Sequence, residues 1–211
     1  MIRIAIADDH AIVRKGLRQI LAETNDLAVT GEAASADELL ALVRQHPFDV
    51  VVLDLSLGSR DGIDLLKVIK SEFPRLHVLI LSMHAEDLFA VRALRAGACG
   101  YVQKEGAPEE LVKAIRRIAS GRKYVSPAMA ERIAGELVHG SDKLPHERLS
   151  DREFHIFRLL GTGQSVTEIA GALNLSVKTV STHRTRILEK TGLRNNAEIV
   201  GYVHSHDLIE S

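Results

Sequence analysis

Short apolar runs alternate with amphipathic stretches over the first 120 residues of this 211-residue chain. Runs that are apolar at nearly every position predict strands covered on both faces, and stretches with a period of 3.6 predict helices. The predicted strands are residues 2–7, 27–33, 50–53, 78–81 and 100–102, and the predicted helices are residues 11–23, 36–45, 63–72, 87–96 and 109–120. Five β–α repeats predict an α/β fold, a doubly wound five-stranded parallel sheet with right-handed crossovers.

The pattern changes after Gly121. Residues 129–137 predict one helix, and residues 139–146 contain Gly and Pro without periodicity, which indicates a linker. Beyond the linker only helix signals remain, so a small all-α domain is expected. We therefore expect a first domain at residues 1–120, a linker with a short helix at 121–146, and a second domain at 147–211.

Serine residues mark the helix starts in the second domain. Ser150 and Ser165 are each followed three residues later by Glu, the pattern of a capping box. Ser176 can cap a helix at residues 177–191, which Gly192 would end. Helices are also predicted at residues 166–173 and 197–206. The short turn at 174–176 fits the spacing of a helix-turn-helix.

Composition narrows the class of protein. Hydrophobic residues make up 45% and charged residues 26%, which is typical of a soluble globular protein. No uncharged apolar stretch approaches 18 residues in length, so we expect no membrane span and a cytoplasmic location. From Pro145 onward eight Arg and Lys balance eight Asp and Glu. Net charge therefore gives no support for nucleic-acid binding, and only the placement of charges can.

Three carboxylates are predicted to meet at one edge of the sheet. Asp8 and Asp9 follow the first strand and Asp54 follows the third. With strand order 2-1-3-4-5 these strands are neighbours, and doubly wound sheets carry their sites at this edge. Like charges about 5 Å apart repel by roughly 3 kcal/mol per pair at an effective dielectric constant near 20. Mg²⁺ would relieve this repulsion, because it prefers carboxylates, waters and a phosphate.

Two further groups are expected at the same edge. Ser82 follows the fourth strand and Lys104 follows the fifth. A carboxylate, a divalent cation, a hydroxyl and an ammonium together suit a phosphoryl group, with Asp54 as the nucleophile that forms an acyl phosphate. The alternative is that these are solvated loop residues. All five falling at the right strand ends favours the site.

These residues lie in motifs that resemble the receiver domain of two-component response regulators over about residues 1–120. The motifs are Ile6-Ala-Asp8-Asp9-His10, Val52-Leu-Asp54-Leu, Leu81-Ser82 and Gly100-Tyr101-Val-Gln-Lys104. The resemblance implies that a sensor histidine kinase phosphorylates Asp54, with Mg²⁺ held by Asp9, Asp54 and the carbonyl of Ser56, and with Asp8 assisting through water. It also implies that Ser82 and Tyr101 are paired switch residues and that Lys104 contacts the phosphoryl group.

Two positions depart from the family pattern. The usual Met-Pro after the acceptor is Leu57-Gly58, and Lys104 is followed by Glu105 rather than Pro. The first change leaves the loop freer, which would alter the lifetime of the phosphoryl group. Neither change removes a reacting group.

The helix at residues 177–191 concentrates the basic charge that the domain total lacks. Residues 176–190 hold four Lys and Arg against one Glu. Val177, Val180, Ile187 and Leu188 are expected to pack inward, and Lys178, Ser181, Thr182, Thr185 and Arg186 to share the outer face. In a helix-turn-helix the second helix enters the major groove. The alternative is an ordinary charged helix face, which charge alone does not exclude.

This region resembles the LuxR-type helix-turn-helix over about residues 147–209. The motifs are Leu149-Ser-Asp-Arg-Glu153, Glu168-Ile-Ala170, Leu175-Ser176, Thr179-Val180-Ser-Thr-His183 and Lys190-Thr-Gly192-Leu193. The two resemblances together indicate the NarL/FixJ class of regulators. They imply base contacts by Ser181, Thr182 and Thr185, backbone contacts by Lys178, Thr179, His183, Arg184, Arg186 and Lys190, and a homodimer formed through residues 197–206.

The sequence thus predicts a DNA-binding transcription regulator controlled by phosphorylation, and not an enzyme. One rival is an enzyme that uses Asp54 and Mg²⁺ for phosphotransfer or phosphatase turnover, but the sequence has no Gly-rich phosphate loop and no substrate-binding motif beside the pocket. A second rival keeps the DNA-binding domain and makes the first domain a phosphorylation-independent dimerisation module. Labelling of Asp54 by acetyl phosphate separates it from the main hypothesis.

Overall fold

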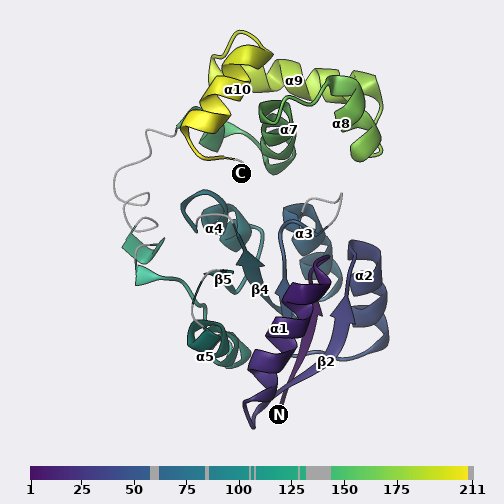
Figure 1. The fold of residues 1–211 in the computed structure, drawn as a ribbon, viewed down its shortest axis with the longest axis vertical. Helices are drawn as coiled ribbons and strands as arrows, with labels where there is room; N and C mark the ends of the chain where they lie inside the picture. Colours follow the sequence, from purple (N-terminus) through teal and green to yellow (C-terminus); the bar gives the residue numbers. More distant parts are fainter. Residues whose placement is uncertain are drawn as a thin grey trace. The chain divides into compact units, whose positions relative to one another are not determined.

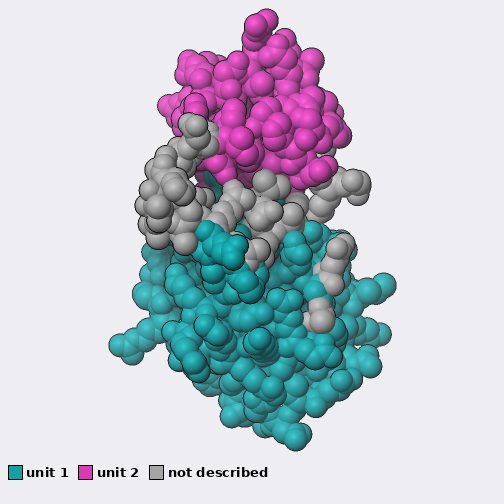
Figure 2. Space-filling view, turned by 90° about the vertical axis from the view of Figure 1, so that its left-hand side faces the viewer, with its two compact units in different colours: residues 1–135 teal, residues 136–211 magenta. Residues whose placement is uncertain are grey.

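The chain forms two compact units, residues 1–135 and 136–211, coloured separately in Figure 2. A computed structural model describes residues 1–57, 62–83, 86–104, 106, 108–127, 129–131 and 144–208. Within these ranges no helix is long and apolar enough to span a lipid bilayer. Each unit is described by itself below.

The first unit is built on a five-stranded parallel sheet with the order β2-β1-β3-β4-β5 (Figure 1). The strands are β1 (Ile2–Ala7), β2 (Leu27–Ala33), β3 (Val50–Leu53), β4 (His77–Ser82) and β5 (Gly100–Gln103). The predicted strand order is confirmed. Strand β4 is one residue longer at each end than its apolar run, and β5 is one residue longer at its end, because ladder pairing continues from Ser82 to Gln103.

Helices cover both faces of this sheet. The helices are α1 (Ala11–Ala22), α2 (Ala36–Gln45), α3 (Gly62–Glu72), α4 (Glu86–Arg95) and α5 (Pro108–Ala119). Buried side chains of α1 and α5, such as Leu21 and Ile115, pack against one face in a cluster with Ile4, Val52 and Leu79. The intervening residues Ala5, Val51 and Ile80 are also fully buried. Burial on both faces explains the uninterrupted apolar runs, since each buried Leu, Ile or Val contributes about 1.5–3 kcal/mol.

The chain continues beyond α5 along the edge of the sheet. Tyr124 forms an isolated parallel bridge with Gly100, its N–H donates to the carbonyl of Cys99 (2.9 Å), and its hydroxyl donates to Glu110 (3.0 Å). A Cβ on Gly100 would lie 2.8 Å from the Tyr124 carbonyl oxygen, so this close approach requires glycine. The start of the predicted linker thus packs on the first unit. Of the helix predicted at 129–137, residues 129–131 are helical and the rest lies outside the described residues.

The second unit contains short helices with well-formed caps. They are a 3₁₀ helix η1 (Pro145–Arg148), followed by α7 (Asp151–Gly161), α8 (Val166–Ala172), α9 (Val177–Thr191) and α10 (Asn196–Ser205). Both predicted capping boxes are confirmed, at Ser150 and Ser165. The side chain of Ser176 accepts from the N–H of Thr179 (3.0 Å), and Gly192 ends α9 with φ of 75°. These local signals set the length of α9, which matches the prediction.

The end of the predicted linker belongs to the core of the second unit. His146 is buried, and its Nδ1 lies 3.0 Å from the hydroxyl of Tyr202. Its ring also lies against Phe154 at a centroid distance of 6.1 Å. A polar residue beside Pro145 gives no periodic signal of burial, so the sequence did not indicate this packing. Residues 139–143 of the predicted linker lie outside the described residues.

Candidate functional site

The carboxyl ends of β1 and β3 bring two aspartates together. The N–H of Asp54 donates to the carbonyl of Ala7 (2.9 Å), so Asp8 and Asp54 leave neighbouring strands at the same level. Their side chains are 1% and 2% exposed. Asp9 and His10 follow directly on the same loop, and ligand atoms of Asp8, Asp9, His10 and Asp54 all lie within 4.8 Å of one another. The predicted convergence of carboxylates is thus present in the structure.

Lys104 reaches into this acidic cluster from the end of β5. Its Nζ donates to Asp54 Oδ2 at 2.7 Å and lies 2.7 Å from Asp8 Oδ2. Burial by itself lowers the pKa of Lys104, but the bonds to Asp54 and Asp8 outweigh burial, so its pKa is raised. For Asp54 the balance is opposite: burial raises the pKa more than Lys104 lowers it. Burial therefore disfavours the ionised form of Asp54 in this pocket.

Of the remaining predicted residues of the pocket, Ser56 and Ser82 lie at the same strand ends and Tyr101 does not. Ser56 donates its backbone N–H to Asp54 Oδ1 (3.1 Å). The carbonyl of Ser82 accepts from the N–H of Lys104 (2.9 Å), which ties the end of β4 to the loop after β5. Ser82 and Tyr101 are both buried. Tyr101 lies within β5, paired with Ile80, and is not part of the acidic cluster.

The donor set of the cluster suits a divalent cation. Three carboxylates face one ammonium, which leaves an excess of negative charge in a buried place. Asp8 Oδ2 is buried and accepts no well-aligned hydrogen bond from any described group, although the ammonium of Lys104 lies close to it. That ammonium is shared with Asp54 Oδ2, so its one positive charge does not balance the two carboxylates. Carboxylate oxygens with room for water are the ligands that Mg²⁺ prefers.

Sequence reasoning missed two members of the pocket. His10 places its Nδ1 2.8 Å from Asp9 Oδ1, and its backbone N–H donates to Asp8 Oδ1 (2.7 Å). Arg14, one turn into α1, donates to the carbonyl of Asp8 at 2.6 Å. His10 follows the two aspartates directly, and histidine is a common metal ligand, so that signal was available. Arg14 has no signal apart from its spacing on α1.

Helix α9 presents the predicted outer face to solvent. Lys178, Ser181, Thr182, Thr185 and Arg186 are all exposed, while Val180 and Ile187 are buried. The prediction that Val177 packs inward is wrong, because its side chain is 48% exposed. Val177 is the first residue after the cap, where the helix still stands clear of its neighbours. Thr182 and Thr185 donate their hydroxyls to the carbonyls four residues earlier, and their oxygens keep free lone pairs.

Other residues predicted to contact DNA make bonds within the unit. Lys190 Nζ donates to Glu153 Oε2 (2.6 Å), and Arg184 Nε donates to Asn196 Oδ1 (2.6 Å). The hydroxyl of Thr179 lies 2.8 Å from that of Ser176 at the helix start. His183 is partly buried, and among the described atoms its Nδ1 has no hydrogen-bond partner. Burial lowers the pKa of His183. Lys190 and Arg184 thus also hold the helices of the unit together.

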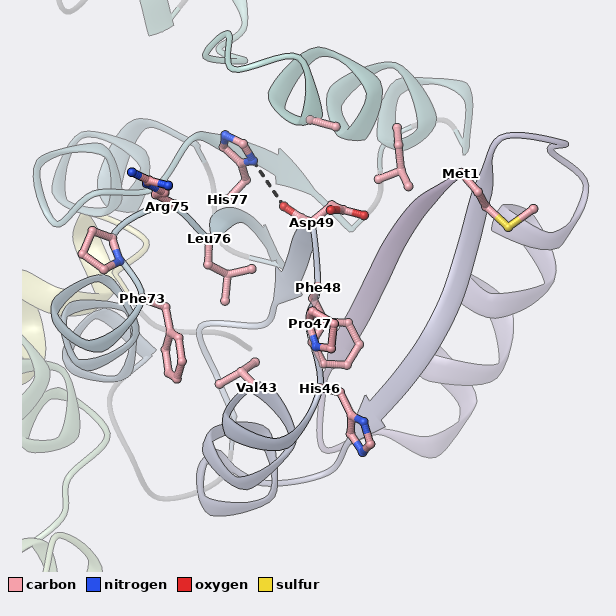
Figure 3. Close-up of a pocket in the computed structure, with 13 residues that line it drawn as sticks. Met1, Val43, His46, Pro47, Phe48, Asp49, Phe73, Arg75, Leu76 and His77 are labelled. Carbon is pink, nitrogen blue, oxygen red and sulfur yellow. Dashed lines mark hydrogen bonds between the residues drawn. The ribbon is translucent and has the colours of Figure 1, made fainter.

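A wide hollow of about 740 Å³ lies at the opposite, amino-terminal end of the strands (Figure 3). Phe48, Phe73 and Leu76 contribute to its apolar lining. At its rim the Nδ1 of His77 lies 3.2 Å from the carbonyl oxygen of Asp49, the interaction drawn as a dashed line. None of the predicted site residues lines this hollow.

Comparison with known proteins identifies both units. Residues 4–116 match the family of response regulator receiver domains, and residues 147–203 match the luxR family of bacterial regulatory proteins. The response regulator UvrY of Escherichia coli strain K12 is 32% identical over 209 residues, covering 99% of this chain and 96% of UvrY. The oxygen regulatory protein NreC of Staphylococcus carnosus is 37% identical over 216 residues, covering 99% of each chain.

Solved structures agree with these relatives. One similar structure is that of RcsB from Salmonella enterica serovar Typhimurium, bound to the promoter rprA in the presence of the phosphomimetic BeF₃⁻. It is 30% identical in sequence to this chain and has a TM-score of 0.74. The match covers 96% of this chain and 98% of the RcsB chain. A second RcsB structure reaches a TM-score of 0.79 at 32% identity, over 97% of each chain. The receiver match covers more than half of the residues, and the relatives match nearly the whole chain. The chain therefore belongs to the NarL/FixJ class of response regulators, transcription regulators that join a receiver domain to a LuxR-type helix-turn-helix domain.

Proposed function

We propose that Asp54 accepts a phosphoryl group from the phosphohistidine of a sensor histidine kinase, and that this controls binding of the chain to promoter DNA. An Asp54 carboxylate oxygen bonds to phosphorus, the bond from phosphorus to the kinase imidazole nitrogen breaks, and its electron pair stays on that nitrogen. The observation that carries the proposal is the buried Asp54 carboxylate, held between Lys104 and the acidic cluster. A buried carboxylate whose pKa is raised by burial is a suitable nucleophile.

Residues around Asp54 can neutralise the negative charge of the phosphoryl group. A phosphoryl group adds about −1.5 to −2 of charge on other side chains. Lys104, already 2.7 Å from Asp54 Oδ2, is placed to follow that charge and bond to a phosphoryl oxygen. Bound Mg²⁺ would neutralise the phosphoryl oxygens, with Asp9, Asp54 and the carbonyl of Ser56 as its ligands and Asp8 acting through water.

The switch is proposed to start at Lys104 and pass to β4 and β5. Lys104 is tied to Ser82 by the backbone bond of 2.9 Å, so a movement of Lys104 perturbs the end of β4. The Ser82 hydroxyl then turns toward the phosphoryl group, and Tyr101 follows on β5. A change from 1:99 to 99:1 between the two states needs about 5.5 kcal/mol of differential stabilisation. A few charge-assisted hydrogen bonds and a dimer contact are of that size.

Promoter binding is assigned to α9. Its exposed Ser181, Thr182 and Thr185 are short enough to approach base edges, and Lys178 and Arg186 beside them can reach phosphates. Thr179, His183, Arg184 and Lys190 would contribute further backbone contacts. A homodimer is proposed to form through α10, whose exposed residues Ala197, Gly201 and Ser205 are small enough for a second helix to approach. We also propose a cytoplasmic location, because the proposed partner is double-stranded DNA.

The test uses the full chain, [³²P]acetyl phosphate with Mg²⁺, and a DNA fragment that the protein itself selects from genomic DNA. We expect the parent and the control Asp64→Asn, which changes a half-exposed aspartate on α3, to take up label and to bind the fragment more tightly afterwards. Asp54→Asn should take up no label and show no such gain, and Thr182→Ala should take up label but lose sequence preference. The proposal fails if Asp54→Asn is labelled, or if labelling leaves DNA affinity unchanged in the parent.

A further inference from the structure

His10 stands against the acidic cluster with its ring largely open to solvent. Its Nδ1 lies 2.8 Å from Asp9 Oδ1 and 3.3 Å from Asp8 Oδ1, and the ring is 66% exposed. The bond from its backbone N–H to Asp8 Oδ1 fixes the residue in this place. An imidazole nitrogen therefore belongs to the same group of atoms as the three carboxylates.

The spacing of these atoms is that of neighbouring ligands around one ion. Metal–ligand distances of about 2.1 Å in an octahedron put adjacent ligand atoms about 3.0 Å apart. The two distances from His10 Nδ1, 2.8 and 3.3 Å, lie on either side of that value. An imidazolium beside two carboxylates would give the same two distances, and the experiment below distinguishes that ion pair from a shared cation. Asp8 Oδ2 and Asp54 Oδ2 share the single ammonium of Lys104, each at 2.7 Å, so the cluster keeps negative charge that a bound cation would balance.

From this geometry we infer that His10 binds the pocket cation through Nδ1 and gives the pocket a preference for divalent transition ions over Mg²⁺. Mg²⁺ takes oxygen ligands, whereas imidazole is a good ligand for first-row transition ions. With His10 in the set, the pocket offers one nitrogen and several oxygens, which suits Mn²⁺ and the ions after it. The inference rests on the proposed function, because it concerns the cation that assists phosphorylation of Asp54.

The test measures cation binding by the full chain without phosphorylation. Mn²⁺ is titrated and followed by electron paramagnetic resonance, Mg²⁺ is titrated in competition with it, and electron spin echo envelope modulation detects a directly bonded ¹⁴N. The variant is His10→Ala. The matched control is His46→Ala, an exposed histidine at the opposite end of the sheet, beside the hollow in Figure 3.

We expect ¹⁴N modulation in the parent and in His46→Ala, and none in His10→Ala. Loss of the ligand should weaken Mn²⁺ binding at least tenfold, since even loss of an outer-shell partner costs about 10–100-fold. Mg²⁺ binding should change less than about twofold. Parent protein that binds Mn²⁺ without ¹⁴N modulation overturns the inference, as does equal weakening of both ions in His10→Ala.

The two proposals fail in different ways. If Asp54 takes up phosphoryl label with Mg²⁺ but bound Mn²⁺ shows no nitrogen ligand, only the role of His10 is wrong. If the parent binds neither cation, the cation-assisted phosphorylation of Asp54 is wrong as well, and the inference goes with it. Because the modulation experiment on the parent needs no variant, the inference stays testable even if His10→Ala folds poorly.

Discussion

Neutralising Asp54 should stabilise the unmodified receiver domain. The carboxylate is almost fully buried, and burial raises its pKa more than the bond from Lys104 lowers it. A carboxyl group whose pKa is raised by folding costs stability once the pH is above its unfolded value, because the folded state holds the charge less readily. Asp54→Asn removes that charge and keeps the size and shape of the side chain. We therefore expect the variant to melt at a higher temperature than the parent at neutral pH.

The magnitude follows from the distances in the pocket. At an effective dielectric constant near 20, attraction between Asp54 and Lys104 at 2.7 Å is about 6 kcal/mol. Repulsion from a carboxylate within 4.8 Å is at least about 3.5 kcal/mol, and Asp8 and Asp9 both lie within that distance. Attraction and repulsion nearly cancel, although Asp9 is partly exposed and its share is screened. The burial cost of the charge then remains, and its removal should be worth about 1–3 kcal/mol.

The assay is thermal unfolding of the full chain by calorimetry, without divalent cations and then with Mg²⁺. A gain of 1–3 kcal/mol corresponds to a rise of about 3–9 °C in the melting temperature of a domain of this size. The gain should shrink as the pH is lowered, because protonation neutralises Asp54 in the parent too. Mg²⁺ should raise the melting temperature of the parent more than that of the variant. Glu23→Gln, which removes an exposed charge on the same unit, should shift stability by no more than about 0.5 kcal/mol. A variant that melts below the parent at neutral pH would refute this account of the pocket.

Three further predictions concern the second unit, each checked by its melting temperature. Lys190→Met should lower the free energy of unfolding by about 1 kcal/mol, because it leaves the buried Glu153 carboxylate without its ammonium partner. The loss is kept this small because Lys190 is partly exposed, so solvent already screens its charge. An unchanged melting temperature would show that the pair does not stabilise the unit. Gly161→Ala should cost about 1–3 kcal/mol, since its Cβ would lie 2.5 Å from a side chain of α10. The control Gly171→Ala meets nothing within 4 Å and should be neutral or stabilising. Ser176→Ala should cost about 0.5–2 kcal/mol by removing the cap of α9, and a cost near zero would contradict that role.

The sequence predicted the fold well because its signals are local. Continuous apolar runs identified β1 and β3 to the residue, and a serine cap and a terminal glycine identified both ends of α9. The acidic cluster was predictable for a different reason: parallel strands end at one edge, so residues just after them must meet. These are statements about periodicity and topology, which a sequence carries directly.

What the sequence did not predict depends on packing between distant segments. The burial of His146 requires Tyr202, which is 56 residues away. The pairing of Lys190 with Glu153 joins α9 to the first turn of α7, and nothing in either segment alone indicates it. Val177 was predicted to be buried and is exposed, because an apolar residue at a helix start need not have a neighbour that covers it.

The receiver pocket and α9 differ in how well their polar groups are satisfied. In the pocket a single ammonium lies 2.7 Å from oxygens of two carboxylates, so its one positive charge does not balance their two negative charges. That imbalance costs stability, and in the proposed mechanism a phosphoryl group and a cation would remove it by forming new bonds to Lys104 and the carboxylates. The strands that hold the pocket are apolar at nearly every position and do not yield, so the exchange has to move the loops at the strand ends. Helix α9 needs no such instability, because its caps and buried residues only have to present a fixed outer face. In the proposed mechanism the change therefore begins at the strand ends, and α9 presents the same capped helix face throughout.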